Sequence, residues 1–415
     1  MSLKRTVTIL TLLVLCFALP VAALDFGLII QQSPEFTNAG APSSNSVVQY
    51  TGNYSPWFSI ALRENLGLYL SAKLSMVYRT GTWHPASPPL LLPELGRFEI
   101  TWRPRPNVYL EAGRLPFQDT LGIIASGFFD GLSGSVVLGK ARISGSLLYT
   151  GFLYKESAKV VMTPNDLAAY GDPFAYAAFG DSYFASRRLI LSVAGEFTDL
   201  SPRSTLSVNA LAQFDLNPPD FTTRLHTQYL SGRYTFAPVE ALTLTGAGVL
   251  GLGQNQDKDF YTHLALSVAL DWEIPGGGID MLQGEFRWSS GAVNQGIRAF
   301  APITAIPQGQ VFSPRFSGLM TIRGKYNIRS GPTLSFSAEG TYFIRTDGTT
   351  LNGDDYLPSA SYLLGAELYS SLQWAPLSDL MVNLGFGAFY PQLGNVFDKN
   401  APIRWKISTG LVFSL

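Results

Sequence analysis

The chain of 415 residues is apolar and poor in charge for its length. Charged residues make up 14% of it, against about 25% in typical soluble domains, while apolar residues reach 46% and aromatic residues 13%. Beyond the N-terminus no apolar run approaches the roughly 18 residues of a transmembrane helix, and the formal net charge of −1 gives no reason to expect nucleic-acid binding. Composition therefore disfavours a soluble domain, a helical membrane protein and a nucleic-acid binder.

The N-terminus has the pattern of a cleaved signal peptide, which we place at residues 1–23. Lys4 and Arg5 precede an apolar run, and the small residues Ala22 and Ala23 supply a cleavage site. An uncleaved membrane anchor is the less favoured alternative, because the run is shorter than the roughly 20 residues needed to span a bilayer. The only cysteine, Cys16, lies inside this segment, so the remaining chain can form neither a disulfide nor a thiolate metal site.

Residues 24–415 are dominated by strict alternation of apolar and polar side chains. It is cleanest from Leu66 to Arg79, from Leu334 to Arg345 and from Ile403 to Leu415. A period of two predicts β-strands with one apolar and one polar face. These strands exceed the usual 5 to 6 residues of soluble sheets and suit tilted strands that cross a bilayer, which need about 9 to 11 residues.

The connections between these strands predict the architecture. Short connections rich in turn-forming residues fall near residues 64–66, 104–107, 139–140, 198–202, 237–240, 275–278, 330–332 and 375–378. Longer ones fall at residues 33–45, 80–89, 116–129, 155–185, 216–220, 254–258, 291–313, 346–360 and 391–401. Eight short and nine long connections give about 18 strands, or 16 or 20 if one hairpin is missed or split. We expect an all-β, transmembrane antiparallel barrel with short periplasmic turns and long extracellular loops.

Such a sheet has to close on itself, because hydrocarbon offers no partner to an unpaired backbone N–H or C=O. A barrel of about 16 to 18 strands is wide enough for a water-filled lumen. Aromatic residues near the predicted strand ends fit the girdles at the two membrane interfaces. These are Phe58, Trp102, Trp272, Trp288, Trp374, Tyr390 and Trp405.

One segment carries a family resemblance. Residues 110–136 read LEAGRLPFQDTLGIIASGFFDGLSGSV, a strand ending in Gly113 and Arg114, an apolar loop, and a strand opening at Asp130 and Gly131. With the signal peptide and the amphipathic C-terminal strand, it resembles bacterial porin-like outer-membrane channels, including the alginate-export type. The resemblance implies solute passage, and biogenesis through periplasmic chaperones and the barrel-assembly machinery. That machinery usually meets a terminal aromatic residue, whereas here Leu415 is terminal.

The parity of each strand predicts which charges line the lumen. The cations placed there include Lys73, Arg79, Arg97, Arg142, Arg188, Arg287, Arg323, Lys325 and Arg345. The acids are Glu99, Glu111, Glu196, Asp215, Asp271, Glu285, Glu339 and Glu367. Over all strands 15 cations face eight acids, which favours a lumen that attracts anions. The alternative is that these charges pair across neighbouring strands.

Two long connections are too apolar to lie in water. Residues 155–185 carry Tyr170, Phe174 and Tyr176 among their aromatic residues, and residues 116–129 carry Phe117 and Phe128. Apolar surface of this extent requires burial, so we expect at least one connection to fold into the lumen and narrow it. The alternatives are packing above the rim or a contact between subunits, since the oligomeric state is open.

An enzymatic site would have to use the three histidines, His84, His226 and His263, which form no catalytic constellation in the sequence. We therefore expect no catalysis, no metal and no cofactor. The sequence predicts a porin-like channel for passive diffusion of small hydrophilic solutes, with some preference for anions, in contact with outer-membrane lipid. A structural or adhesive barrel with a capped lumen is the alternative, and conductance would separate the two.

Overall fold

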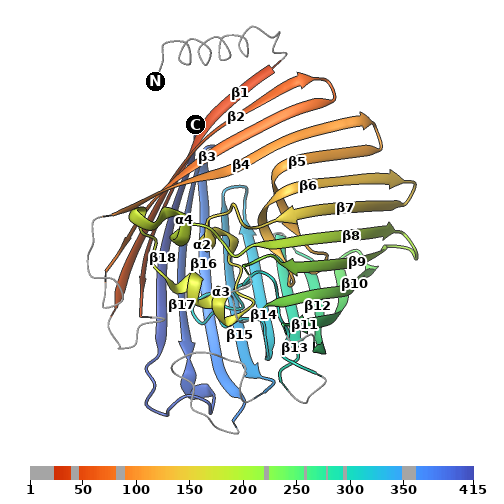
Figure 1. The fold of residues 1–415 in the computed structure, drawn as a ribbon. Coiled ribbons are helices and arrows are strands. Elements are labelled where there is room, and N and C mark those ends of the chain that lie inside the picture. Colours follow the sequence, from red (N-terminus) through yellow and green to blue (C-terminus); the bar gives the residue numbers. More distant parts are fainter. Residues whose placement is uncertain are drawn as a thin grey trace.

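The computed structural model describes residues 23–38, 46–80, 89–218, 224–256, 259–276, 279–292, 297–347 and 361–415. These residues form one antiparallel sheet of 18 strands in which each strand pairs with its neighbours in the chain (Figure 1). The strands are β1 (Ala23–Thr37), β2 (Val47–Arg63), β3 (Leu66–Arg79), β4 (Leu90–Arg105), β5 (Val108–Gln118), β6 (Ser126–Leu138), β7 (Ala141–Tyr149), β8 (Arg188–Thr198), β9 (Ser204–Asp215), β10 (Leu225–Val239), β11 (Leu242–Asn255), β12 (Phe260–Ile274), β13 (Ile279–Ser289), β14 (Leu319–Ser330), β15 (Leu334–Arg345), β16 (Leu363–Leu377), β17 (Leu380–Tyr390) and β18 (Arg404–Ser414).

The sheet closes between its first and last strands. Strand β1 pairs with β2 on one side and with β18 on the other. Leu28 donates its backbone N–H to the carbonyl of Leu415 at 3.0 Å and accepts from the N–H of Leu415 at 2.9 Å. The predicted closed barrel of 18 strands is confirmed. Eight short turns lie at the barrel end where β1 begins and β18 ends, and nine longer connections lie at the opposite end.

The two faces follow the alternation of the sequence. On β8, Val193 is 61% exposed on the outer face, while Ile190, of opposite parity, is fully buried on the luminal face. Trp102, Trp272 and Trp374 are exposed within a few residues of the short turns, where an interfacial girdle is expected.

One irregularity changes which charges reach the lumen. The register between β3 and β4 shifts between Ser71 and Ala72, because Gly96 is an extra residue in β4. A bulge of this kind resets the parity of the strand. As a result Glu94 and Arg97 both face the lumen, although strict alternation places them on opposite faces.

Helices occur only in the long connections of the described residues. They are α2 (Lys155–Ala158), α3 (Pro164–Gly171), η1 (Tyr176–Ala178), α4 (Phe179–Ser182) and η2 (Pro391–Leu393). None of the helices in these ranges is long and apolar enough to cross a membrane. Residues 1–22 lie outside the described part of the chain, so the signal peptide 1–23 and the division at residue 24 remain predictions.

The parity of the two faces predicts an asymmetric response to charge. Val193→Arg places a cation on the outer face at mid-strand and should lower the free energy of unfolding in lipid vesicles by about 2–4 kcal/mol. Ala194→Arg places the same cation one residue further on, on the luminal face beside Ser144 and Asn209, and should change it little. Equal losses in urea titrations of the two variants would contradict the assignment of faces.

Candidate functional site

Three long connections turn back into the barrel and lie against its luminal face. They are residues 119–125 between β5 and β6, residues 150–187 between β7 and β8, and residues 290–318 between β13 and β14. Asp166 of α3 pairs with the luminal Arg188 at 2.6 Å, and the luminal Tyr229 donates its hydroxyl to the carbonyl of Ala301. Figure 1 accordingly draws α2 and α3 against the strands rather than beyond the barrel end.

The three connections bind one another at a single place. The N–H of Ile303 donates to the carbonyl of Ile124 at 2.7 Å, and the N–H of Ala305 donates to that of Lys159 at 2.9 Å. Thr304 forms an isolated β-bridge with Val160. We call this meeting point the loop junction, and it comprises residues 123–126, 158–162 and 303–305.

An apolar core holds the loop junction against the wall. Its buried loop side chains are Ile123, Ile124, Ala125, Ala158, Val160, Met162, Phe300, Ile303 and Phe316. The wall contributes Ile190, Leu211, Leu225, Tyr229, Val249 and Ala265 from β8 to β12, Phe129 and Leu148 from β6 and β7, and Leu319, Phe343, Leu364 and Phe389 from β14 to β17. Burial of each large apolar side chain stabilises by roughly 1.5–3 kcal/mol, so the connections are packed rather than loosely tethered. We call β8 to β12 the covered half.

Buried carboxylates fix the backbone of these connections. Glu367 on β16 accepts the N–H groups of Gln310, Val311 and Phe312 at 2.7–2.9 Å. Asp119 likewise accepts four backbone N–H groups of its own connection, at 2.8–3.1 Å. Irregular backbone leaves donors without a ladder partner, and a carboxylate can accept several of them at once.

Arg188 carries the contact between α3 and the wall. It is fully buried and pairs with both Asp166 and Asp215. Asp166 also accepts the N–H of Thr163, whose hydroxyl in turn accepts the N–H of Asp166 in a capping box at the start of α3. Removal of one partner from a buried pair strands the other charge, so this group locks α3 in place.

Three residues expected to line the pore do not meet pore water. Arg188, Arg345 and Glu367 face the luminal side, as their parity predicts, but are 0%, 3% and 1% exposed. The connections cover them, and each is bonded to a connection. These three side chains are thus covered on the luminal side, a feature that strand parity cannot predict because it does not reveal what packs on top of a strand.

The opposite half of the wall carries water-accessible charges. Arg323 on β14 contacts Glu285 at 3.5 Å and Glu339 at 3.2 Å, and Arg287 donates to Glu285 at 2.7 Å. Across the closing strands, Lys406 pairs with Glu35 at 2.8 Å. We call β13 to β18 together with β1 to β4 the charged half; at its long-connection end Arg345 and Glu367 are buried, and the accessible charges lie elsewhere on these strands.

Within this half the cations are more exposed than several of the acids that pair with them. The side chain of Lys73 is 32% exposed and that of its partner Glu94 is 9%. The side chain of Arg97 is 37% exposed and that of Glu99 is 5%. Cross-strand and same-strand pairing therefore removes much of the simple charge excess, and Glu35 and Glu94 are two further luminal acids. What remains is an asymmetry of exposure.

The other predicted lumen cations lie apart from the loop junction. Arg142 is exposed and donates to Ser135, and it lines a polar cavity of about 620 Å³ near the short turns together with Arg233, Glu111 and Glu196. Lys325 is partly buried on β14, opposite Glu339 in register, and Arg79 is partly exposed at the outer end of β3.

The aromatic residues expected to form a constriction take two positions. Phe117 packs edge-on against Phe129 with ring centroids 5.8 Å apart, and Phe128 faces a cavity of about 290 Å³ beside Lys73 and Arg97. A second set lies against β4 rather than at the loop junction. This aromatic cluster comprises Tyr154, Phe174, Tyr176, Phe179, Tyr183 and Phe184.

Tyr170 lies on α3, partly buried. Residues 119–125 and α3 thus lie against the luminal side, while the aromatic cluster lies along the edge of β4. Whether either connection narrows a water path stays a prediction.

Residues 290–318 were recognised in the sequence only as a long connection. They carry two charges, Arg298 and Arg315, and three widely spaced phenylalanines, Phe300, Phe312 and Phe316. Dense aromatic residues predict burial of the other two connections, but aromatic residues are sparse in this one. The feature of the sequence that indicates burial here is the presence of only two charged residues among 29.

The histidines do not gather into a site. His226 accepts the backbone N–H of Asp215 at 3.1 Å. His263 is buried among the rings of Tyr229, Tyr261 and Phe300. His84 lies outside the described residues.

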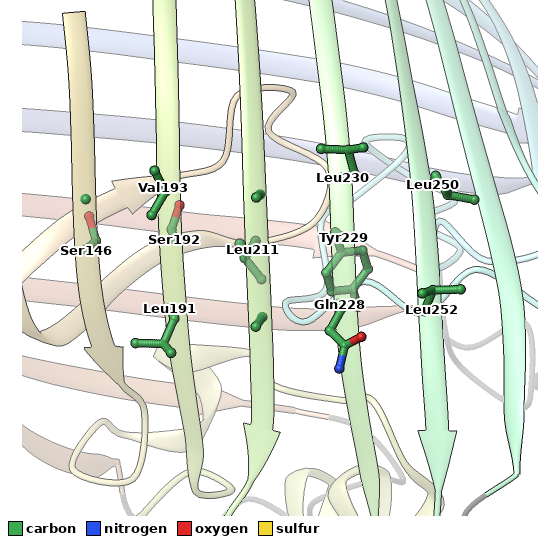
Figure 2. A pocket seen from close by; sticks show the side chains of 13 residues that line it. Ser146, Leu191, Ser192, Val193, Leu211, Gln228, Tyr229, Leu230, Leu250 and Leu252 are labelled. Carbon is green, nitrogen blue, oxygen red and sulfur yellow. The ribbon is translucent and has the colours of Figure 1, made fainter.

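An apolar hollow lies on the outer face. Figure 2 shows Leu191, Val193, Leu230, Leu250 and Leu252 around this hollow, whose volume is about 690 Å³. Its floor consists of Gly145, Ala210 and Ala212. Because it is apolar and faces lipid, it lies off the solute path.

Comparison with known proteins identifies the fold class. No protein-family model matches the chain, and no curated protein matches it. Among solved structures, three from Pseudomonas aeruginosa are similar: OccK2 (OpdF), with 10% identity and a TM-score of 0.62 over 95% of this chain and 98% of that one; OpdQ, with 10% and 0.60 over 94% and 98%; and the outer membrane protein OprD, with 11% and 0.58 over 94% and 93%. The chain therefore has the fold of an outer-membrane porin, as the resemblance implied.

The anchoring role of Glu367 predicts a gain of conductance. Glu367→Gln removes the charge that holds residues 310–312 and should cost roughly 1.5–3 kcal/mol of stability. The freed connection should raise single-channel conductance or its fluctuation in planar bilayers. Glu196→Gln, a luminal change at the short-turn end, is the matched control. Identical traces for both variants and the parent would contradict the anchoring role.

Proposed function

We propose that this protein is an outer-membrane channel through which small hydrophilic solutes diffuse along the charged half of the lumen. The observation that supports it most is the accessibility of the charged side chains on β13 to β18 and β1 to β4. Connections that filled the whole lumen would bury Lys73, Arg97 and Arg323 as well, as they bury Arg188 on β8, Arg345 on β15 and Glu367 on β16. The solvent exposure of Lys73, Arg97 and Arg323 supports a polar path past the loop junction.

The exposure asymmetry supports a preference for anions. Where an ion pair holds its carboxylate against the wall and presents its ammonium or guanidinium to water, an anion in the lumen meets the cation first. Lys73 with Glu94 and Arg97 with Glu99 have this arrangement. Guanidinium groups also present paired N–H donors that match carboxylates, so small organic acids are the class of solute we favour.

Single-channel recording of the purified barrel tests the channel itself. Deletion of residues 160–180, and separately of residues 118–127, removes parts of the connections that converge on the loop junction and should raise conductance. Folding of each variant is checked by its heat-dependent mobility in detergent gels, which closed barrels of this class show. Silence of the parent and of both folded deletion variants would favour the structural or adhesive barrel instead.

Ion selectivity should follow the charged half. Arg323→Glu together with Lys325→Glu reverses two luminal cations, and the reversal potential across a salt gradient should move toward cation selectivity. Lys140→Glu together with Arg203→Glu makes the same change of charge at the short turns, where both side chains are largely exposed, and should move it much less. Cation selectivity of the parent protein would contradict the proposed preference.

A further inference from the structure

The barrel wall contains a seam at the outer end of β4. Strands β4 and β5 pair only from Phe98 with Arg114 toward the short turn, and β6 and β7 pair only from Asp130 with Tyr149. Beyond these points residues 115–118 and 126–129 pair with each other alone. Among the described strands, Leu90–Arg97 of β4 therefore has no partner on its β5 side.

Glycines allow the β5–β6 hairpin to leave the wall. Gly113 and Gly131 face each other in register just before the departure. Gly113 has a φ of 127°, and a Cβ there would overlap the carbonyl of Phe98. A Cβ on Gly131 would overlap the carbonyl of Leu147. Only glycine fits both positions, so this pair acts as the hinge from which the hairpin bends inward.

Side chains replace the missing strand along the edge of β4. The carbonyl of Leu91 accepts from the hydroxyl of Tyr176, and that of Pro93 accepts from the hydroxyl of Tyr183 at 2.9 Å. The carbonyl of Leu95 accepts from Arg114 at 2.7 Å. Burial raises the pKa of Tyr183 to about 12, so its hydroxyl remains a donor. Each of the three carbonyls that point from this edge toward the missing strand therefore has a hydrogen-bond donor. Pro93 has no N–H that would need a partner.

Arg114 ties together the three parts that meet at the seam. Its guanidinium pairs with Asp130 of β6 at 2.8 Å, reaches Leu95 of β4, and donates to the carbonyl of Phe152 in the β7–β8 connection at 3.1 Å. It is 5% exposed, although it has the same parity as the lipid-facing Leu110. A charge on the outward parity is tolerated there because the connection lies across it.

The seam separates an apolar surface from a charged cavity. On the exposed side Phe152 is 63% exposed, and Tyr176 of the aromatic cluster is 59% exposed. On the luminal side lies the cavity of about 290 Å³, lined among others by Lys73, Glu94, Arg97 and Phe128. An amphipathic molecule with an acidic head would find an aromatic surface for its apolar part and two cations for its head.

We propose that this seam is a lateral gate, through which an amphipathic organic acid passes between the charged cavity of the lumen and the outer leaflet of the membrane. The gate is the segment 152–184 lying over the edge of β4, and Arg114 is its latch. This path is distinct from diffusion of hydrophilic solutes along the barrel axis. Side chains also replace single ladder bonds at other strand ends, but along this edge of β4 they meet three alternate carbonyls, those of Leu91, Pro93 and Leu95.

Spin labelling tests access from lipid. With Cys16 in the predicted signal peptide, Phe128→Cys gives a single reactive thiol in the luminal cavity. In phosphatidylcholine vesicles, Arg114→Ala should raise the collision rate of this label with lipid-soluble oxygen several-fold relative to the parent. Arg287→Ala, which removes a luminal arginine from an ion pair far from the seam, should leave it unchanged. No difference between the two variants would overturn the latch.

A reversible lock tests the path in the folded protein. Ser157 donates to Glu94 at 3.0 Å across the seam, so Ser157→Cys with Glu94→Cys can be joined by a short bifunctional methanethiosulfonate. We expect the cross-linked protein to lose transfer of a pyrene-bearing alkyl sulfonate from the outer leaflet to a quencher trapped inside vesicles, and reduction to restore it.

Chloride conductance of the same cross-linked sample reports the axial channel separately. Retained conductance with lost transfer supports the gate. Three results would overturn the gate. The first is sulfonate transfer that the cross-link does not change, and the second is no transfer in the reduced protein. The third is a cross-link that abolishes transfer and chloride conductance together. In the first two cases the axial channel stands if chloride conductance is present.

Discussion

The pairing of backbone N–H and C=O groups is the constraint on which the rest of this structure depends. In hydrocarbon no water is present to hydrogen-bond an unpaired backbone group. The sheet of 18 strands therefore closes on itself, with Leu28 of β1 and Leu415, which follows β18, exchanging two backbone hydrogen bonds. The exception follows the same rule. Where the β5–β6 hairpin leaves the wall, Tyr176, Tyr183 and Arg114 supply the donors that a neighbouring strand would have given.

The same requirement governs the connections that fill the lumen. The described residues of the 290–318 connection contain no helix or strand, yet many of them are buried against the wall, so their backbone donors need partners of another kind. Glu367 supplies three such contacts from the wall, and Asp119 does so within its own connection. Acidic residues inside the barrel are therefore of two kinds. Some accept hydrogen bonds from backbone N–H groups of the connections, and others form ion pairs with cations that are exposed to water.

This division explains why a count of luminal charges is a poor guide to the lumen. Arg188 and Glu367 have the parity of pore residues but belong to the packing of the connections. Lys73 and Arg97 are paired, yet they extend into water beyond the carboxylates that hold them. The electric field that a solute meets depends on which member of each ion pair is exposed. Along β3 and β4 the exposed members are the cations Lys73 and Arg97, which attract anions.

The sequence by itself determined the strands, their number, their two faces and the closed barrel, because period-two alternation and turn-forming residues are local properties that survive any packing. It also marked residues 116–129 and 155–185 as too apolar for water. Only the tertiary structure decided where those connections lie, that residues 290–318 join them, and that Gly96 brings Glu94 to the lumen. It also decided that, among the described strands, Leu90–Arg97 of β4 has no partner on its β5 side. These features depend on contacts between residues far apart in the chain, whose free energy no local pattern records.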